Sequence, residues 1–219
     1  GFDIEIWINP IVTGPYVVIE GTVKDRYTKD NLAAEVYIED DSTGVFIAKG
    51  NTDIATGKYT LKVPVNRPLN ISANSISHAF KTTDSLVKQS SVINFLLDTL
   101  YSGFKLSLYN IHFYPNKDDI LPSSVAELNR LLTFMKTKPE WVIKITGHTN
   151  TNVFAPAKYL QQLSFNRALA VKKFLVQNSI PEKRISCAGL GGKEPLIISK
   201  DPQAGLKNLR VEVTLVRRL

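Results

Sequence analysis

The spacing of apolar residues changes midway along this 219-residue chain, and that change restricts its fold more than any other feature. From Tyr16 to about Asp98, apolar and polar residues alternate in short runs such as Ala34–Ile38 and Gly57–Val63, with turn residues between the runs. Alternation with a turn about every ten residues is typical of the strands of a small β-sandwich. We therefore expect the first half of the chain to form an all-β sandwich.

The second half alternates strand patterns with longer segments of helical spacing. The first such segment has an apolar stripe of Val125, Leu128, Leu131, Leu132 and Met135, and the second stacks Ser164, Ala168, Val171 and Leu175 on one face. Ser124 followed by Glu127 predicts a capping box at the start of its first helix. The expected order is βαβαββ, with strands at Leu106–Tyr114, Trp141–Ile145, Ile185–Leu190 and Leu209–Leu215 and helices at Pro122–Met135 and Tyr159–Asn178. This order predicts an α+β domain with a mixed sheet and both helices on one face. The chain thus divides into a lead-in segment (1–15), the β-sandwich (16–98) and the α+β domain (99–219).

Charge is distributed as unevenly as the apolar residues. Residues 1–98 hold 9 Lys and Arg against 12 Asp and Glu, a net charge of −3. Residues 99–219 hold 18 against 8, a net charge of +10, which indicates an anionic partner. The basic residues are scattered, without the interleaved aromatic residues of single-strand binders, so we do not expect nucleic acid to be that partner.

Motifs of common enzymes are missing from the sequence, including Gly-x-Ser-x-Gly, the P-loop and His-Glu-x-x-His. His112 and His148 fall near predicted strand ends and could approach each other, but a histidine in a strand is more often packed and hydrogen-bonded than a ligand. Cys187 is the single cysteine, so no internal disulfide forms. We expect no catalysis, no metal and no cofactor, and no run is apolar enough to span a membrane.

A more informative group of residues spans the second strand-to-helix junction. Gly147–Asn150 ends a strand, and Leu163–Ala168 falls in the early part of the helix that follows. A strand-end loop facing the first turns of a helix forms a polar pocket with backbone N–H groups pointing outward. Arg167 would supply a planar guanidinium suited to a carboxylate there.

The segment from about Tyr109 to Val216 resembles the OmpA-like peptidoglycan-binding domain through several separate motifs in the family's order. These motifs read here Phe113-Tyr114-Pro115-Asn116, Gly147-His148-Thr149-Asn150, Leu163-Ser164-Phe165-Asn166-Arg167-Ala168-Leu169-Ala170-Val171, Gly189-Leu190-Gly191 with Pro195, and Asn208-Leu209-Arg210-Val211-Glu212. The βαβαββ order read from spacing agrees with the fold of that family.

The resemblance implies non-covalent binding of the peptide stem of peptidoglycan through its diaminopimelate residue. By family role, Arg167 would hold a carboxylate in a bidentate pair, and each charged hydrogen bond is worth about 1.5–3 kcal/mol. Asn150 would receive the amino-acid head group. The resemblance places four further residues around the pocket and adds one from the closing motif: Asn116, Thr149, Thr151 and Asn152, and Arg210.

Three positions depart from the family pattern. The family's aspartate is Asn150 here, the asparagine before Leu-Ser is Leu160, and the first arginine of Asn-Arg-Arg is Leu209. Loss of the aspartate charge would cost about 1–2 kcal/mol of binding. The pocket is therefore retained, retuned to another ligand, or retired, and in the last case the chain is a protein-interaction scaffold of an envelope or secretion complex. A hydrolase acting on peptidoglycan would need paired carboxylates in a suitable pocket, and this sequence shows no such pair.

The first half resembles, more loosely, a carboxypeptidase-regulatory-like β-sandwich in Glu20–Asp25, Ala34–Ile38 and Gly57–Leu61. Modules of that kind are spacers or docking units, so envelope or secretion-complex proteins are its expected partners. The combination resembles envelope proteins of Bacteroidetes-type bacteria, some of them associated with type IX secretion. This resemblance implies a periplasmic, outer-membrane-associated location, with any export signal or lipid anchor upstream of Gly1.

Overall fold

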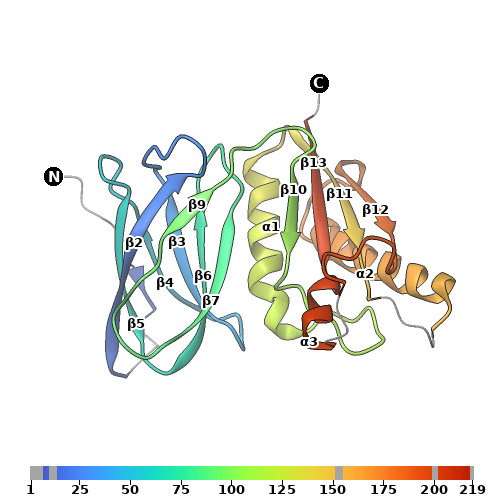
Figure 1. Ribbon diagram of the computed structural model, residues 1–219. Coiled ribbons are helices and arrows are strands. Elements are labelled where there is room, and N and C mark those ends of the chain that lie inside the picture. Colours follow the sequence, from blue (N-terminus) through green and yellow to red (C-terminus); the bar gives the residue numbers. More distant parts are fainter. Residues whose placement is uncertain (1–6, 10–13, 151–154, 199–201, 218–219) are drawn as a thin grey trace. The chain divides into compact units, whose positions relative to one another are not determined.

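The computed structural model describes residues 7–9, 14–150, 155–198 and 202–217 (Figure 1). The chain forms two compact units, Gly1–Leu100 and Tyr101–Leu219. In the described residues, no helix has both the length and the apolar character needed to cross a membrane.

The first unit is built from strands. They are β1 (Trp7–Ile8), β2 (Tyr16–Asp25), β3 (Glu35–Asp40), β4 (Phe46–Asn51), β5 (Lys58–Pro64), β6 (Arg67–Asn74), β7 (Lys81–Val87), β8 (Ser91–Val92) and β9 (Phe95–Leu97). One sheet has the order β1-β4-β3-β6-β7, and the other has the order β5-β2-β8, with β9 also paired to β2. The strands expected at Ala34–Ile38 and Gly57–Val63 are confirmed as β3 and β5.

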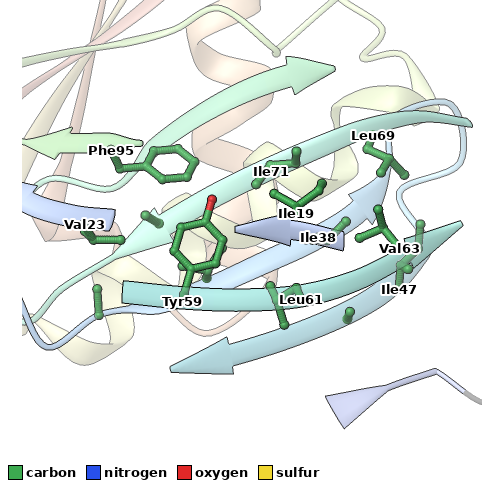
Figure 2. Packing of buried hydrophobic residues seen from close by; sticks show 14 of the residues in the cluster. Ile19, Val23, Ile38, Ile47, Tyr59, Leu61, Val63, Leu69, Ile71 and Phe95 are labelled. Atoms are coloured by element: carbon green, nitrogen blue, oxygen red, sulfur yellow. The ribbon is translucent and has the colours of Figure 1, made fainter. Parts of the chain in front are cut away.

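One hydrophobic core holds the two sheets of the first unit together. Figure 2 shows Ile19 and Leu61 from one sheet packed among Ile38, Ile47 and Ile71 from the other. Each of these five side chains is fully buried, and complete burial of such a side chain stabilises the fold by about 1.5–3 kcal/mol. The apolar residues of the alternating runs therefore point into one interior that the two sheets share. The likeness to a carboxypeptidase-regulatory-like module stays a prediction.

The second unit is one mixed sheet with helices. Its elements are β10 (Lys105–Leu108), α1 (Val125–Thr137), β11 (Trp141–Gly147), α2 (Ala157–Gln177), β12 (Ile185–Gly189), α3 (Pro202–Gly205) and β13 (Val211–Arg217), with 3₁₀ turns at Pro122–Ser124, Glu182–Arg184 and Leu206–Asn208. The sheet order is β10-β13-β11-β12; β11 and β12 run parallel, and β13 is antiparallel to both β10 and β11. The mixed sheet is confirmed, and α3 is an addition to the expected order.

The apolar face predicted for the second helix is confirmed in α2. Ser164, Ala168, Val171 and Leu175 are all fully buried, as their spacing of three and four residues requires. In α1, by contrast, Val125 at the start of the predicted stripe is 40 % exposed and Leu132 is half-buried, while Leu128, Leu131 and Met135 are buried. α2 packs on β11 and β12 and also contacts α1.

Two predictions about the start of the second unit are wrong. Ser124 makes no capping hydrogen bond, because its Oγ accepts from the backbone N–H of His112 (2.8 Å) and donates to the His112 carbonyl (3.1 Å). The first strand ends at Leu108 rather than at Tyr114, and beyond it Phe113 forms an isolated bridge with Ile120. Both differences arise because the segment after β10 pairs with the chain leading into α1.

Candidate functional site

A small pocket lies where three strands of the second unit end or begin. Leu108 at the end of β10 and Gly147 at the end of β11 both pair with Val211, the first residue of β13. The pocket has a volume of about 90 Å³ and is lined by Ile111, His112, Phe113, His148, Arg167, Leu209 and Arg210. Segments that follow β10 and β11 and precede β13 thus meet there, with α2 contributing one side chain.

Arg167 reaches the pocket from the middle of α2. The position differs from the expected one in the first turns of the helix, so no free N–H groups of a helix terminus accompany the guanidinium. Arg167 is only 8 % exposed; its Nε donates to the Lys117 carbonyl at 3.0 Å, and the guanidinium carbon lies 4.9 Å from the centre of the Phe113 ring. Burial lowers its pKa, and Tyr159 and Asp118 act in the opposite direction.

Asn116 contributes to this arrangement through the backbone of its turn. It has a left-handed conformation (φ 56°), which asparagine tolerates better than most residues. The turn is closed by the Lys117 N–H, which donates to the Tyr114 carbonyl at 3.0 Å. The Lys117 carbonyl is thereby fixed toward Arg167, whereas the side chain of Asn116 is exposed and is not part of the pocket lining.

Arg210 lines the pocket but is held by a neighbouring acid. Its Nε donates to Glu212 Oε1 at 2.8 Å, its Nη2 lies 2.7 Å from the same oxygen, and both terminal nitrogens donate to the Glu194 carbonyl at 3.3 Å. Both side chains of the pair are more than 90 % buried. Arg210 is therefore neutralised within the protein, and Arg167 is the guanidinium left for a ligand.

His148 lies beside this pair and is 1 % exposed. Burial, and then the charge of Arg210, lower the pKa of its imidazole from 6.5, while Glu212 and Glu194 act in the opposite direction. Nε2 lies 3.5 Å from Glu212 Oε2, and neither ring nitrogen has a hydrogen-bond partner among the described residues. The ring is therefore neutral at pH 7, and its contact with Glu212 is not an ion pair.

Thr149 and Asn150 lie next to the pocket rather than in its lining. The Thr149 N–H donates to the Gly191 carbonyl at 2.9 Å, and its hydroxyl is buried without a partner in the described part of the chain. The half-buried side chain of Asn150 lies against Gly205 of α3, where a methyl group on Gly205 would come within 3.2 Å of Asn150 Nδ2. Thr151 and Asn152, also predicted as site residues, lie outside the described residues.

Of the predicted site residues, the structure brings Arg167 and Arg210 together in the pocket lining. Sequence reasoning missed Glu212 as the partner of Arg210, and it missed Ile111 and Leu209 as apolar walls. A signal for Glu212 was present, because residues two apart on a strand share one face. His112 and His148, which by their predicted positions could approach each other, both line the pocket.

The second unit is thus an α+β domain with a small, partly cationic pocket at one end of its sheet. Residues 112–208 match the OmpA family, so this part of the chain is an OmpA-like domain. Among curated proteins, outer membrane porin F of Pseudomonas fluorescens is 29 % identical over 106 residues, 48 % of this chain and 32 % of the porin. Peptidoglycan-binding protein ArfA of Mycobacterium tuberculosis is 28 % identical over 96 residues, 44 % of this chain and 29 % of ArfA.

The chain spans about a third of the length of these curated relatives. Similar solved structures include a putative MotB-like protein from Desulfovibrio vulgaris, with 25 % identity, a TM-score of 0.46 and coverage of 52 % of this chain and 74 % of the other. Another is the peptidoglycan-associated lipoprotein from Burkholderia pseudomallei, with 22 % identity, a TM-score of 0.44 and coverage of 48 % and 87 %.

Proposed function

We propose that the second unit binds peptidoglycan non-covalently, and that the chain thereby attaches an envelope assembly to the cell wall. The observation that carries this proposal is the Arg167 guanidinium, which is oriented by the Lys117 carbonyl and the Phe113 ring inside a pocket. An oriented guanidinium is suited to a carboxylate, and peptide stems of the wall carry carboxylates.

The likeness to known proteins supports this proposal. The match of residues 112–208 to the OmpA family covers every residue that lines the pocket except Ile111, Leu209 and Arg210. One relative of that segment is named a peptidoglycan-binding protein and another an outer membrane porin. These names support the further proposal that this chain lies in the periplasm, associated with the outer membrane.

In its finer form, the proposal names the diaminopimelate residue of the stem peptide as the ligand of Arg167. The role is binding rather than catalysis, and it needs no cofactor. A charged hydrogen bond of this kind contributes about 1.5–3 kcal/mol, so one guanidinium supports a modest affinity. The first unit would then be a docking unit for envelope or secretion-complex proteins, with the type IX system as one candidate.

A sedimentation assay with purified peptidoglycan sacculi tests the proposal. We expect the chain to sediment with sacculi and Arg167→Ala to lose at least about tenfold in apparent affinity, because the variant loses its one ligand-facing guanidinium. Lys173→Ala is the matched control, since it removes one exposed positive charge from the same helix. Equal retention of the wild type and Arg167→Ala would contradict binding through this pocket. A wild type that stays in solution would instead favour the interaction scaffold.

A further inference from the structure

Within the described residues, the lining of the pocket has one guanidinium that is not paired with an acid, that of Arg167. It combines Arg167, Arg210 and two histidines with three apolar side chains, and no carboxylate lines it among the residues that the structure describes. An amino-acid head group with both a carboxylate and an ammonium has one charge that this lining complements and one that it does not. A buried ammonium without a counter-charge is costly.

The nearest acid, Glu212, is already occupied. Its Oε1 accepts a hydrogen bond from Arg210 Nε and lies 2.7 Å from Nη2 of the same guanidinium, and its Oε2 faces His148 at 3.5 Å. A ligand ammonium would have to compete with a buried guanidinium for this carboxylate. Asp118, which acts electrostatically on Arg167, is exposed on the neighbouring turn, so water screens its charge.

Asn150 does not fill this role either. Its amide carries no charge, and its side chain lies against Gly205, 3.2 Å from where a methyl group on that glycine would stand. Among the residues that the structure describes, both the type and the position of Asn150 therefore leave the pocket lining without an anionic group for an ammonium.

A second, independent feature indicates a ligand in this pocket. His148 is 99 % buried, lines the pocket, and has two ring nitrogens without hydrogen-bond partners in the described part of the chain. Buried polar atoms normally have partners, so an unpaired ring beside a pocket is a position where a ligand or a water would form a hydrogen bond.

Two walls of the pocket are apolar. Ile111 and Leu209 line it and can contact the carbon atoms next to a bound carboxylate.

We infer that this pocket recognises an aliphatic carboxylate without its neighbouring ammonium, so that a wall peptide whose side-chain amine is absent or blocked binds as well as one with a free amine. This inference rests on the proposed function and specifies the ligand class of the same site. Arg167 pairs with the carboxylate, and His148 and the apolar walls contact the rest of the head group.

Calorimetric titration of the whole chain with two tripeptides tests the inference. One is L-alanyl-γ-D-glutamyl-meso-diaminopimelate, and the other carries 2-aminopimelate in the last position and so lacks only the side-chain amine. We expect the amine-free peptide to bind within about threefold of the first peptide or more tightly, and Arg167→Ala to weaken both by at least about tenfold. Asn150→Asp should leave the ratio of the two affinities within about threefold, because residue 150 faces Gly205.

The outcomes separate the inference from the proposed function. A loss of about tenfold or more for the amine-free peptide would overturn the inference and leave peptidoglycan binding intact. The same holds if neither peptide binds while sacculi are retained, because the pocket then does not read this head group. If the peptides and the sacculi all fail to bind, the proposed function falls together with the inference. Asp118→Asn is the control for the exposed acid on the turn next to Arg167. If this variant bound only the amine-bearing peptide more weakly, that result would also contradict the inference.

Discussion

Glu212 is the buried carboxylate on which the charge balance of the pocket depends. It accepts a hydrogen bond from Arg210 within a buried ion pair and faces the neutral ring of His148. A buried ion pair adds little net stability compared with an apolar pair, but removal of one partner leaves the other charge buried and uncompensated.

Glu212→Gln is therefore expected to destabilise the second unit by about 3–5 kcal/mol, measured by urea denaturation. The control is Glu182→Gln, because the Glu182 carboxylate pairs with Lys172 at 2.9 Å but is 72 % exposed. Exposed pairs contribute about 0–1 kcal/mol, so the two variants make the same chemical change at buried and exposed positions. Similar losses of unfolding free energy in both variants would show that burial of the Arg210–Glu212 pair does not affect stability.

His148 gives the second unit a pH dependence whose sign follows from its burial. Its pKa is lowered in the folded state, so the unfolded chain binds the proton more tightly. Stability is therefore complete above the unfolded pKa of 6.5 and declines as the pH falls below it toward the folded pKa. Groups that set the folded value are Arg210 and Lys105, which lower it, and Glu212 and Glu194, which raise it.

We expect the urea midpoint of the second unit to decrease when the pH is lowered from 7.5 to 5.5, and to decrease less in His148→Gln. His112→Gln is the control, because His112 lines the same pocket but its side chain is exposed. A decline of the same size in His148→Gln as in the wild type would assign the pH dependence to other groups.

For single residues, the sequence predicts which residues belong to the site better than it predicts where their side chains point. Arg167 could be singled out because its motif and its helix are local features. The direction of Asn150 could not, since it depends on contact with Gly205, which comes from a distant part of the chain. The hydroxyl of Ser124 was assigned to a cap for the same reason: its actual partner, His112, lies in another segment.

At the scale of elements, α2 approaches the sheet where two neighbouring strands end in glycine. Gly147 of β11 pairs with Gly189 of β12. A methyl group on Gly147 would come within 2.0 Å of the Ser164 carbonyl, and one on Gly189 within 2.4 Å of the Phe165 backbone nitrogen. The backbone of α2 therefore rests on these two glycines at Ser164 and Phe165, three and two residues before Arg167 on the same helix.

Gly189→Ala should push α2 away from the sheet. We expect a loss of about 1–3 kcal/mol in the unfolding free energy of the second unit, as overpacking does, together with weaker retention on sacculi. Ser186→Ala, at an exposed position of the same strand, is the control and should change neither. A stability loss without any loss of retention would show that the position of α2 does not control the pocket.

The elements also show what spacing alone could predict. The buried face of α2 and the alternating strands of the first unit follow from local periodicity, so they were predictable from sequence. The early end of β10 was not, because the residues after Leu108 alternate well enough for a strand. They leave the sheet since Phe113 pairs with Ile120 instead.

The whole molecule consists of two units of opposite charge. The unit Gly1–Leu100 has a net charge of −3, and the unit Tyr101–Leu219 has a net charge of +10. A positive domain attracts an anionic polymer over a distance that salt shortens, to about 8 Å at physiological ionic strength. Under the proposed function, this charge would draw the second unit toward an anionic polymer, and the pocket would make the short-range contact that follows.

The pairing of β10 with β13 has a mechanical consequence. Lys105 lies opposite Thr214, and Leu108 lies opposite Val211. The pocket adjoins the Leu108–Val211 end of this pairing, and the chain arrives from the first unit at the Lys105–Thr214 end. Tension between a wall-bound pocket and the rest of the chain would therefore run along β10. Because ladder hydrogen bonds are perpendicular to the strands, such a pull loads them together, in shear, instead of opening them one after another from an end. We therefore expect a domain whose first strand is loaded in shear to resist unfolding under tension.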